Sequence, residues 1–195
     1  MSLIASMAAF ALAASISPGP VNIVALSSGA RYGFSASLRH VTGATVGFSA
    51  LLLLTGIGLH EVIVEWPQVT DAIRWAGAVF LLYMAWRLAS DSGELDPGSA
   101  SKRPSISQGA AMQWLNPKAW LASVAGMGTY ASGGDASAVW LFTAVYFVIC
   151  YLSIASWAWA GSFLQNYLRN AARVRIFNRA MAVTIVLSVV YLMTS

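Results

Sequence analysis

Charged residues are scarce in this chain of 195 residues, because Asp, Glu, Lys and Arg together make up only 9% of it. Ordinary soluble domains carry roughly 25%. Hydrophobic residues instead account for 58% of the sequence. This composition excludes a typical soluble enzyme, a disordered tail and a nucleic-acid-binding module, so we expect no nucleic acid among the partners.

Cysteine is nearly absent as well. The single cysteine, Cys150, excludes an internal disulfide, a redox pair of cysteines and a thiolate metal cluster. No cluster of His, Asp and Glu lies within the apolar segments, and the GxSG serine motif of rhomboid-like proteases is missing. We therefore expect no enzyme activity, no cofactor and no metal site.

Long apolar segments dominate what is present. They cover residues 3–28, 41–64, 72–88, 106–130, 139–163 and 176–193, and the most polar stretch separates the third from the fourth at residues 89–105. A helix crosses the lipid bilayer with about 20 such residues. The pattern predicts an all-α membrane protein with six transmembrane helices, built as a single transmembrane domain over residues 1–195.

The positions of Lys and Arg predict the orientation of these helices. Of the 11 positive residues, nine fall on one side of the six-helix arrangement, Arg74 falls on the other, and Lys118 lies inside a span. By the positive-inside rule the nine-charge side is cytoplasmic, so both termini face outward. No Lys or Arg precedes Arg31, which favours a first membrane span over a cleaved signal peptide.

The two halves of the chain, about residues 1–92 and 104–195, share one layout. Each has three apolar spans, and the first of the three is interrupted by proline, at Pro18 and Pro20 in one half and at Pro117 in the other. Halves with three spans have opposite topologies in the membrane. The sequence thus predicts two inverted three-helix repeats with broken first and fourth helices, whose breaks meet and form a substrate site.

The first break reads Pro18-Gly19-Pro20. Proline lacks the backbone donor and opens the helix, and free backbone groups at membrane depth persist only in protein or beside a wet cavity. The half-helix after Pro20 would direct its amino end, which attracts anions, at that cavity. Asn22 in its first turn would then donate to a carboxylate. The alternative is a plain kink that packs against neighbouring helices.

Lys118 is the only charged residue in the middle of a predicted span. A charge at that depth costs about 2.5 kcal/mol or more. Four explanations remain open: it binds a substrate anion, rests on carbonyls at a helix end, is neutral part of the time, or reaches the inner interface. Amide and aromatic side chains that suit a zwitterion surround it in the sequence: Gln113, Trp114, Asn116 and Trp120.

Other residues have simpler interpretations. Gly43 and Gly47 have the spacing of close helix packing, and they would also let the second helix approach the first break. His40 and His60 fall at span ends, where we expect them to lie at the membrane interface. Cys150 is expected to be a small buried residue.

Three segments resemble a known family: residues 17–34 (SPGPVNIVALSSGARYGF), 74–88 (RWAGAVFLLYMAWRL) and 109–120 (GAAMQWLNPKAW). The chain resembles the LysE/RhtB amino-acid exporter family and looks most similar to its cysteine/O-acetylserine branch. The resemblance implies secondary active export across the bacterial inner membrane by proton antiport. It marks Pro18, Gly19, Pro20, Asn22, Asn116, Pro117 and Lys118 as functional positions.

We therefore expect an amino-acid site between the two breaks, with Lys118 and the amides near Asn22 on the carboxylate. Trp114, Trp120 and freed carbonyls would face the ammonium. Such a small bundle is compatible with a homodimer. Two alternatives stay open. One is export of another small solute, with a metal ion disfavoured because the spans lack ligands, and the other is a non-transporting membrane scaffold.

Overall fold

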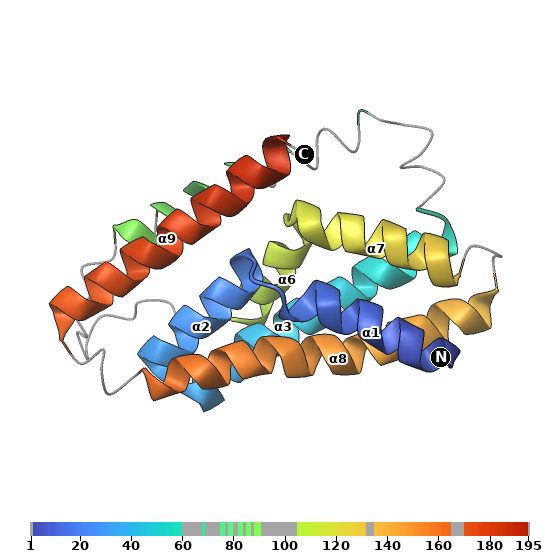
Figure 1. Ribbon diagram of the computed structural model, residues 1–195, viewed down its shortest axis with the longest axis horizontal. Helices are drawn as coiled ribbons and strands as arrows, with labels where there is room; N and C mark the ends of the chain where they lie inside the picture. Colours follow the sequence, from blue (N-terminus) through green and yellow to red (C-terminus); the bar gives the residue numbers. More distant parts are fainter. Residues whose placement is uncertain are drawn as a thin grey trace.

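The structure is a computed structural model that describes residues 2–59, 105–131, 135–164 and 170–194, and between the first two ranges residues 68, 75–76, 78–79, 82–83, 85–86 and 88–90. These residues form helices and no strand, which confirms the predicted all-α class (Figure 1). The elements are α1 (Leu3–Ile16), α2 (Pro20–Tyr32), α3 (Phe34–Leu54), the π-helical turn η1 (Thr55–Leu59), α6 (Ile106–Trp114), α7 (Pro117–Tyr130), α8 (Ala136–Phe163) and α9 (Ala171–Thr194).

Several of these helices are long and apolar enough to cross a membrane. Among the described residues, the continuous ones are Phe34–Gly58 and Ala136–Phe163. The bent pair of α1 and α2, which meet at 64°, makes a third crossing if it counts as one span. Helix α9 covers the predicted sixth span. About half of the predicted third span, His60 and most of the polar central loop lie outside the described residues.

Both predicted breaks occur at their prolines. Helix α1 ends at Ile16, and α2 begins at Pro20 after Gly19, whose backbone is extended. Helix α6 ends at Trp114, and α7 begins at Pro117. Proline suits the first position of a helix because its missing N–H has no partner there in any case. The chain thus leaves the helix at each break and starts a new one, instead of only kinking.

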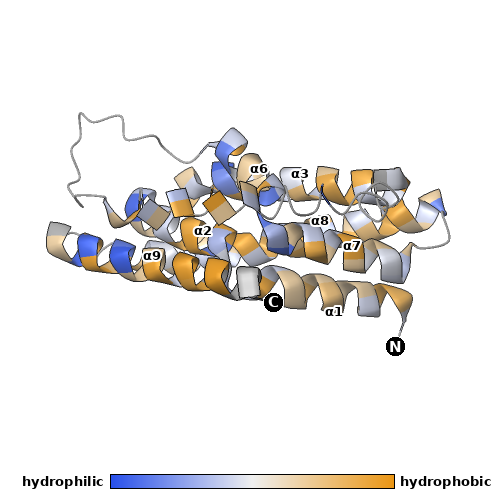
Figure 2. Cartoon of the chain, turned by 90° about the horizontal axis from the view of Figure 1, so that it is seen from above, coloured by the Kyte–Doolittle hydropathy of each residue, from blue (hydrophilic) through white to orange (hydrophobic). Residues whose placement is uncertain are grey.

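Helix α8 is the centre of the bundle and packs against α1, α2 and α3 (Figure 1). One of its faces is buried, with Phe142, Tyr146, Cys150 and Ile154 spaced four residues apart. Its other side exposes large apolar side chains, among them Trp140, Phe147, Leu152 and Trp159. Figure 2 shows apolar residues along much of the length of these helices. An apolar outer surface on such helices suits contact with lipid.

Small residues let α2 approach α8 until their backbones touch. A Cβ atom on Gly29 would collide with the carbonyl of Ala158, and one on Gly161 would collide with the carbonyl of Leu26. The two glycines therefore serve the same contact from opposite helices. Contacts of this kind are a common way to pack helices in membranes, where close van der Waals contact replaces the hydrophobic effect.

A second backbone contact joins α3 to α6. A Cβ on Gly43 would collide with the carbonyl of Ile106, and one on Gly47 would lie 2.7 Å from the Cα of Ala110. Both glycines thus pack α3 against the first half of the broken fourth span. That they also let α3 approach the first break stays a prediction.

Candidate functional site

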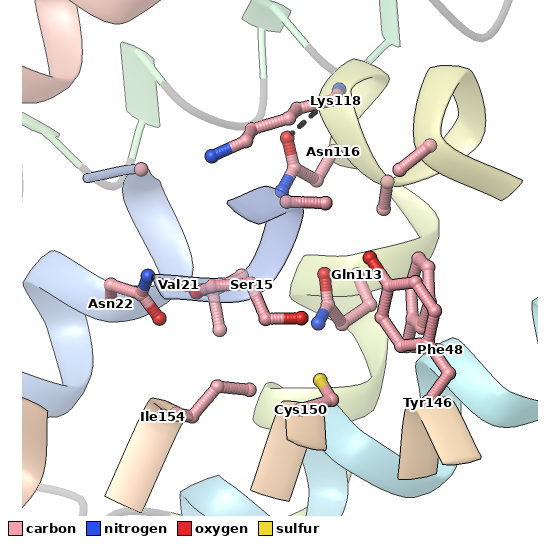
Figure 3. Close-up of a pocket in the computed structure, with 14 residues that line it drawn as sticks. Ser15, Val21, Asn22, Phe48, Gln113, Asn116, Lys118, Tyr146, Cys150 and Ile154 are labelled. Carbon is pink, nitrogen blue, oxygen red and sulfur yellow. Dashed lines mark hydrogen bonds between the residues drawn. The ribbon is translucent and has the colours of Figure 1, made fainter. Parts of the chain in front are cut away.

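A cavity of about 40 Å³ lies between the two breaks (Figure 3). One water occupies roughly 10–15 Å³ by this kind of measure, so only about three waters fit. The site is therefore small. Six helices contribute its lining residues, which are Ala14, Ser15, Gly19, Val21, Asn22, Phe48, Gln113, Asn116, Lys118, Ala119, Ala122, Tyr146, Cys150 and Ile154.

Lys118 connects the two broken spans. Its Nζ donates to the carbonyl oxygen of Ser17 at 3.2 Å and to the Ser17 Oγ at 2.7 Å. Ser17 caps the carboxyl end of α1, where helix carbonyls concentrate partial negative charge. The only acidic residue among those described is Asp135, at the start of α8. Helix-end oxygens, and no carboxylate of the described residues, hold the lysine in this structure.

Asn22 uses its side-chain amide within the first break. Its Nδ2 donates to the carbonyl of Ser15 at 2.7 Å and to that of Ser17 at 3.0 Å. Asn22 therefore fastens the end of α1 to the start of α2. The sequence suggested that it donates to a substrate carboxylate, but here both hydrogens of the amide already have partners.

The second break is closed in a similar way by Asn116, whose Oδ1 accepts a hydrogen bond from the backbone N–H of Lys118 at 3.2 Å (Figure 3). Asn116 is thus the N-cap of α7, and it is 5% exposed. Gln113, one helical turn earlier, also lines the cavity. Pro18, Pro20 and Pro117 shape the breaks but do not line the cavity themselves.

The two tryptophans expected to face an ammonium lie elsewhere. Trp114 donates from Nε1 to the carbonyl of Gly47 at 3.0 Å, and Trp120 donates to the carbonyl of Trp114 at 2.7 Å. Their rings meet edge to face at 6.2 Å. Neither ring lines the cavity. They instead tie α6 to α3 and α7: the Trp114 N–H reaches a carbonyl inside α3, and the Trp120 N–H reaches the carbonyl of Trp114 at the end of α6.

The cavity also holds side chains that the sequence did not single out. Ser15 of α1 lines the cavity together with Tyr146 and Cys150 of α8. Figure 3 shows Lys118 and Asn116 on one side of the cavity, with Cys150, Tyr146 and Ile154 on the other. The sequence feature that could have identified Tyr146, Cys150 and Ile154 is their four-residue spacing, which puts them on one face of a helix. It was not decisive, because α8 is apolar all round and its sequence selects no face.

Ser17 was missed although a local signal marked it. A residue before proline is driven out of the helical conformation, so its carbonyl loses the usual partner. Ser17 precedes Pro18, and its backbone is extended (φ −61°, ψ 140°). A free carbonyl at this depth needs a donor, which Asn22 and Lys118 supply.

His40 was expected at the membrane interface, and the structure corrects this. Helix α3 begins at Phe34, so His40 lies in its second turn, where it is 0% exposed. Its Nε2 lies 3.3 Å from the carbonyl oxygen of Val21 in the first turns of α2. Gly109 of α6 packs onto the backbone carbonyl of His40. Close packing of α6 thus covers a residue that the apolar pattern had placed at a span end.

Comparison with known proteins adds to this geometry. The family described as LysE type translocator matches residues 12–195, which include every residue that lines the cavity. Proteins named cysteine/O-acetylserine efflux protein from Escherichia coli O157:H7, Escherichia coli strain K12 and Shigella flexneri serotype 5b are each 29% identical over 174 residues, or 88% of either chain. No solved structure matches significantly. The chain therefore belongs to the LysE type translocator family and is a transport protein, not an enzyme.

Proposed function

We propose that this protein is a secondary active exporter of neutral amino acids or their derivatives, of the cysteine and O-acetylserine kind, across the bacterial inner membrane. The observation that carries the proposal is the contact of Lys118 with Ser17. It brings both proline breaks to one cavity and puts the single cation of the described interior there. Relatives named as efflux proteins for cysteine and O-acetylserine support the substrate class.

The helix ends around the cavity suit a zwitterion. Helices α2 and α7 begin there, and helix amino ends attract a carboxylate. Helix α1 ends there, and its carbonyls attract an ammonium group. In our proposal the substrate carboxylate draws Lys118 away from Ser17, and the ammonium takes its place on the Ser15 and Ser17 carbonyls. The exchange keeps every charged group partnered.

The lining also favours a substrate with a neutral side chain. Lys118 would repel a basic side chain, and no acidic residue lines the cavity to compensate. The space beside α8 offers the hydroxyls of Ser15 and Tyr146, the thiol of Cys150 and the apolar Ile154. Such a surface suits a small polar group such as a thiol or an ester.

Transport needs the cavity to open, because a volume of about 40 Å³ is too small for an amino acid. We infer alternating exposure by two inverted three-helix repeats, α1 to α3 with the third span and α6 to α9, with proton antiport as the energy source. Matching breaks before Pro20 and Pro117 support the repeat. A homodimer remains compatible with this arrangement.

The orientation gives a direct prediction. The end of α2 and the start of α3, which contain Arg31 and Arg39, lie at the end of the molecule where α9 starts, and the N-terminus lies at the opposite end (Figure 1). In a Cys150→Ser background, a cysteine at Ser2 is expected to react with a membrane-impermeant maleimide on spheroplasts. A cysteine at Ser101 in the polar loop is expected to react only after lysis. The reverse labelling would contradict outward-facing termini.

Cys150 allows the site itself to be tested, since it is the only cysteine and lines the cavity. Methyl methanethiosulfonate is expected to reduce efflux from proteoliposomes by more than about fivefold, because the added group fills a small cavity. Excess cysteine would react with the reagent, so O-acetylserine is the protecting substrate, and it is expected to slow the modification severalfold. Labelled O-acetylserine efflux and mass spectrometry of Cys150 measure the two effects.

The matched control is Cys150→Ser, which keeps a small hydroxyl at the position and is expected to transport without sensitivity to the reagent. Equal modification rates with and without O-acetylserine would place the substrate elsewhere. Absence of efflux for every amino acid offered to folded wild-type protein would remove amino acids as the substrate class.

A further inference from the structure

His40 links three helices behind the wall of the cavity. It belongs to α3, its Nε2 lies 3.3 Å from the carbonyl of Val21 on α2, and Gly109 of α6 packs against its backbone. Val21 also lines the cavity. The ring is therefore separated from the substrate space by one residue of the broken first span. A change at His40 acts on the start of α2, and hence on the shape of the site.

The ring has one partner and no countercharge. When Nε2–H donates to the Val21 carbonyl, Nδ1 is the acceptor nitrogen, and it has no hydrogen-bond partner among the described residues. On its own helix the nearest charged residue is the exposed Arg39. The titratable residues of α2 are Arg31 and Tyr32, at its far end, α6 has none, and those of α8 are Tyr146, Cys150 and Tyr151.

Few described groups can take up a proton from a neutral state. Tyr146 and Cys150 are neutral acids that can only release one. Lys118 already donates from its ammonium group to two oxygens of Ser17. Asp135 lies exposed at the start of α8, away from the cavity. Among the described interior residues, His40 alone offers a free acceptor nitrogen on a basic side chain.

Protonation at Nδ1 would be incompatible with the packing seen here. It would create a fully buried imidazolium with a single hydrogen-bond partner and no carboxylate among the described residues. An unpaired buried charge costs several kcal/mol. The proton-bound ring must therefore reach water or a new partner on its Nδ1 side, which requires the packing of α3 beside the start of α2 to change.

We propose that His40 is the proton-binding residue of the exporter, and that its protonation rearranges the packing of α3 beside the start of α2 and so dismantles the substrate site. The inference rests on the proposed proton-coupled export. Substrate stabilises the arrangement in which His40 is neutral, and a proton on Nδ1 stabilises the one in which the site is open. Proton and substrate thus exclude each other, as antiport requires.

The variant His40→Gln tests this, because glutamine keeps an amide donor for the Val21 carbonyl but cannot be protonated. In proteoliposomes it is expected to exchange labelled for unlabelled O-acetylserine within about twofold of wild type. Accumulation driven by an imposed pH gradient is expected to fall more than tenfold. His60→Gln, at the only other histidine of the chain, is the matched control and is expected to keep both activities.

A second measurement does not depend on how His40→Gln folds. In the His60→Gln protein labelled with ¹⁵N-histidine, the ring signals belong to His40 alone. Saturating O-acetylserine is expected to shift them towards the neutral form and to release about one proton per substrate bound.

Three results would overturn the inference. The first is that His40→Gln still accumulates O-acetylserine normally when a pH gradient is imposed. The second is that substrate leaves the protonation of His40, as its ring signals report it, unchanged. The third is wild-type exchange without any response to the pH gradient, which would remove proton coupling but leave amino-acid transport intact. Absence of exchange in wild type would instead count against the proposed function itself.

Discussion

Lys118→Met is expected to lower efflux by about ten- to one-hundred-fold while the amount of protein in the membrane stays the same. Methionine keeps the length of the side chain and removes its charge. A hydrogen bond to a charged group contributes about 1.5–3 kcal/mol, which corresponds to this range of affinity. The resting contact with Ser17 disappears as well, but Asn22 still holds the Ser17 carbonyl, so the first break stays closed.

Initial rates of labelled O-acetylserine efflux against substrate concentration measure this effect, with quantitative blotting of the inserted protein. Lys102→Met is the matched control, because Lys102 is the only other lysine of the chain. Lys118→Arg is expected to retain part of the activity, since it keeps the charge in a larger group. Unchanged efflux in Lys118→Met would remove this residue from the mechanism. Altered assembly without a specific loss of flux would favour a membrane scaffold.

The largest structural effect is expected from Gly29→Ala. Its methyl group would collide with the backbone carbonyl of Ala158, and neither helix can yield locally because Gly161 meets the backbone of α2 in the same contact. Overpacking of a close contact costs about 1–3 kcal/mol. For a chain of this size we expect the midpoint of thermal unfolding to fall by about 2–12 °C.

Gly128→Ala is the matched control, since a Cβ at Gly128 meets no atom within 4 Å. Both changes add the same methyl group to a glycine within a helix, so their difference isolates the contact between α2 and α8. Thermal unfolding in detergent, followed by the fraction of monodisperse protein, measures it. Equal midpoints for the two variants would show that α2 and α8 do not meet at Gly29.

The two helix breaks and the interior position of Lys118 could be predicted from the sequence, because each depends on the properties of single residues. Proline lacks a donor wherever it occurs, so Pro20 and Pro117 end one helix and start another without help from the rest of the fold. The apolar stretches that became α1 to α3 and α6 to α9 were equally plain, because the bilayer demands length and hydrophobicity from each helix alone.

The partners inside the site depend on contacts between distant segments. Lys118 donates a hydrogen bond to Ser17, which lies 101 residues earlier in the chain. Trp114 donates to the carbonyl of Gly47 and does not line the cavity. His40 is buried because α6 covers it, which no property of its own helix requires. In an apolar chain most helix faces look alike, so periodicity does not select the inner one.

By itself, the sequence determined where the two broken spans stop and restart and that one cation lies between the two breaks, since proline geometry and charge cost act residue by residue. Only the tertiary structure decided that the end of α1 holds Lys118, that α8 presents Tyr146 and Cys150 to the cavity, and that His40 lies behind Val21. The reason is that backbone contacts at small residues set the mutual rotation of the helices, and that rotation chooses which side chains face inward.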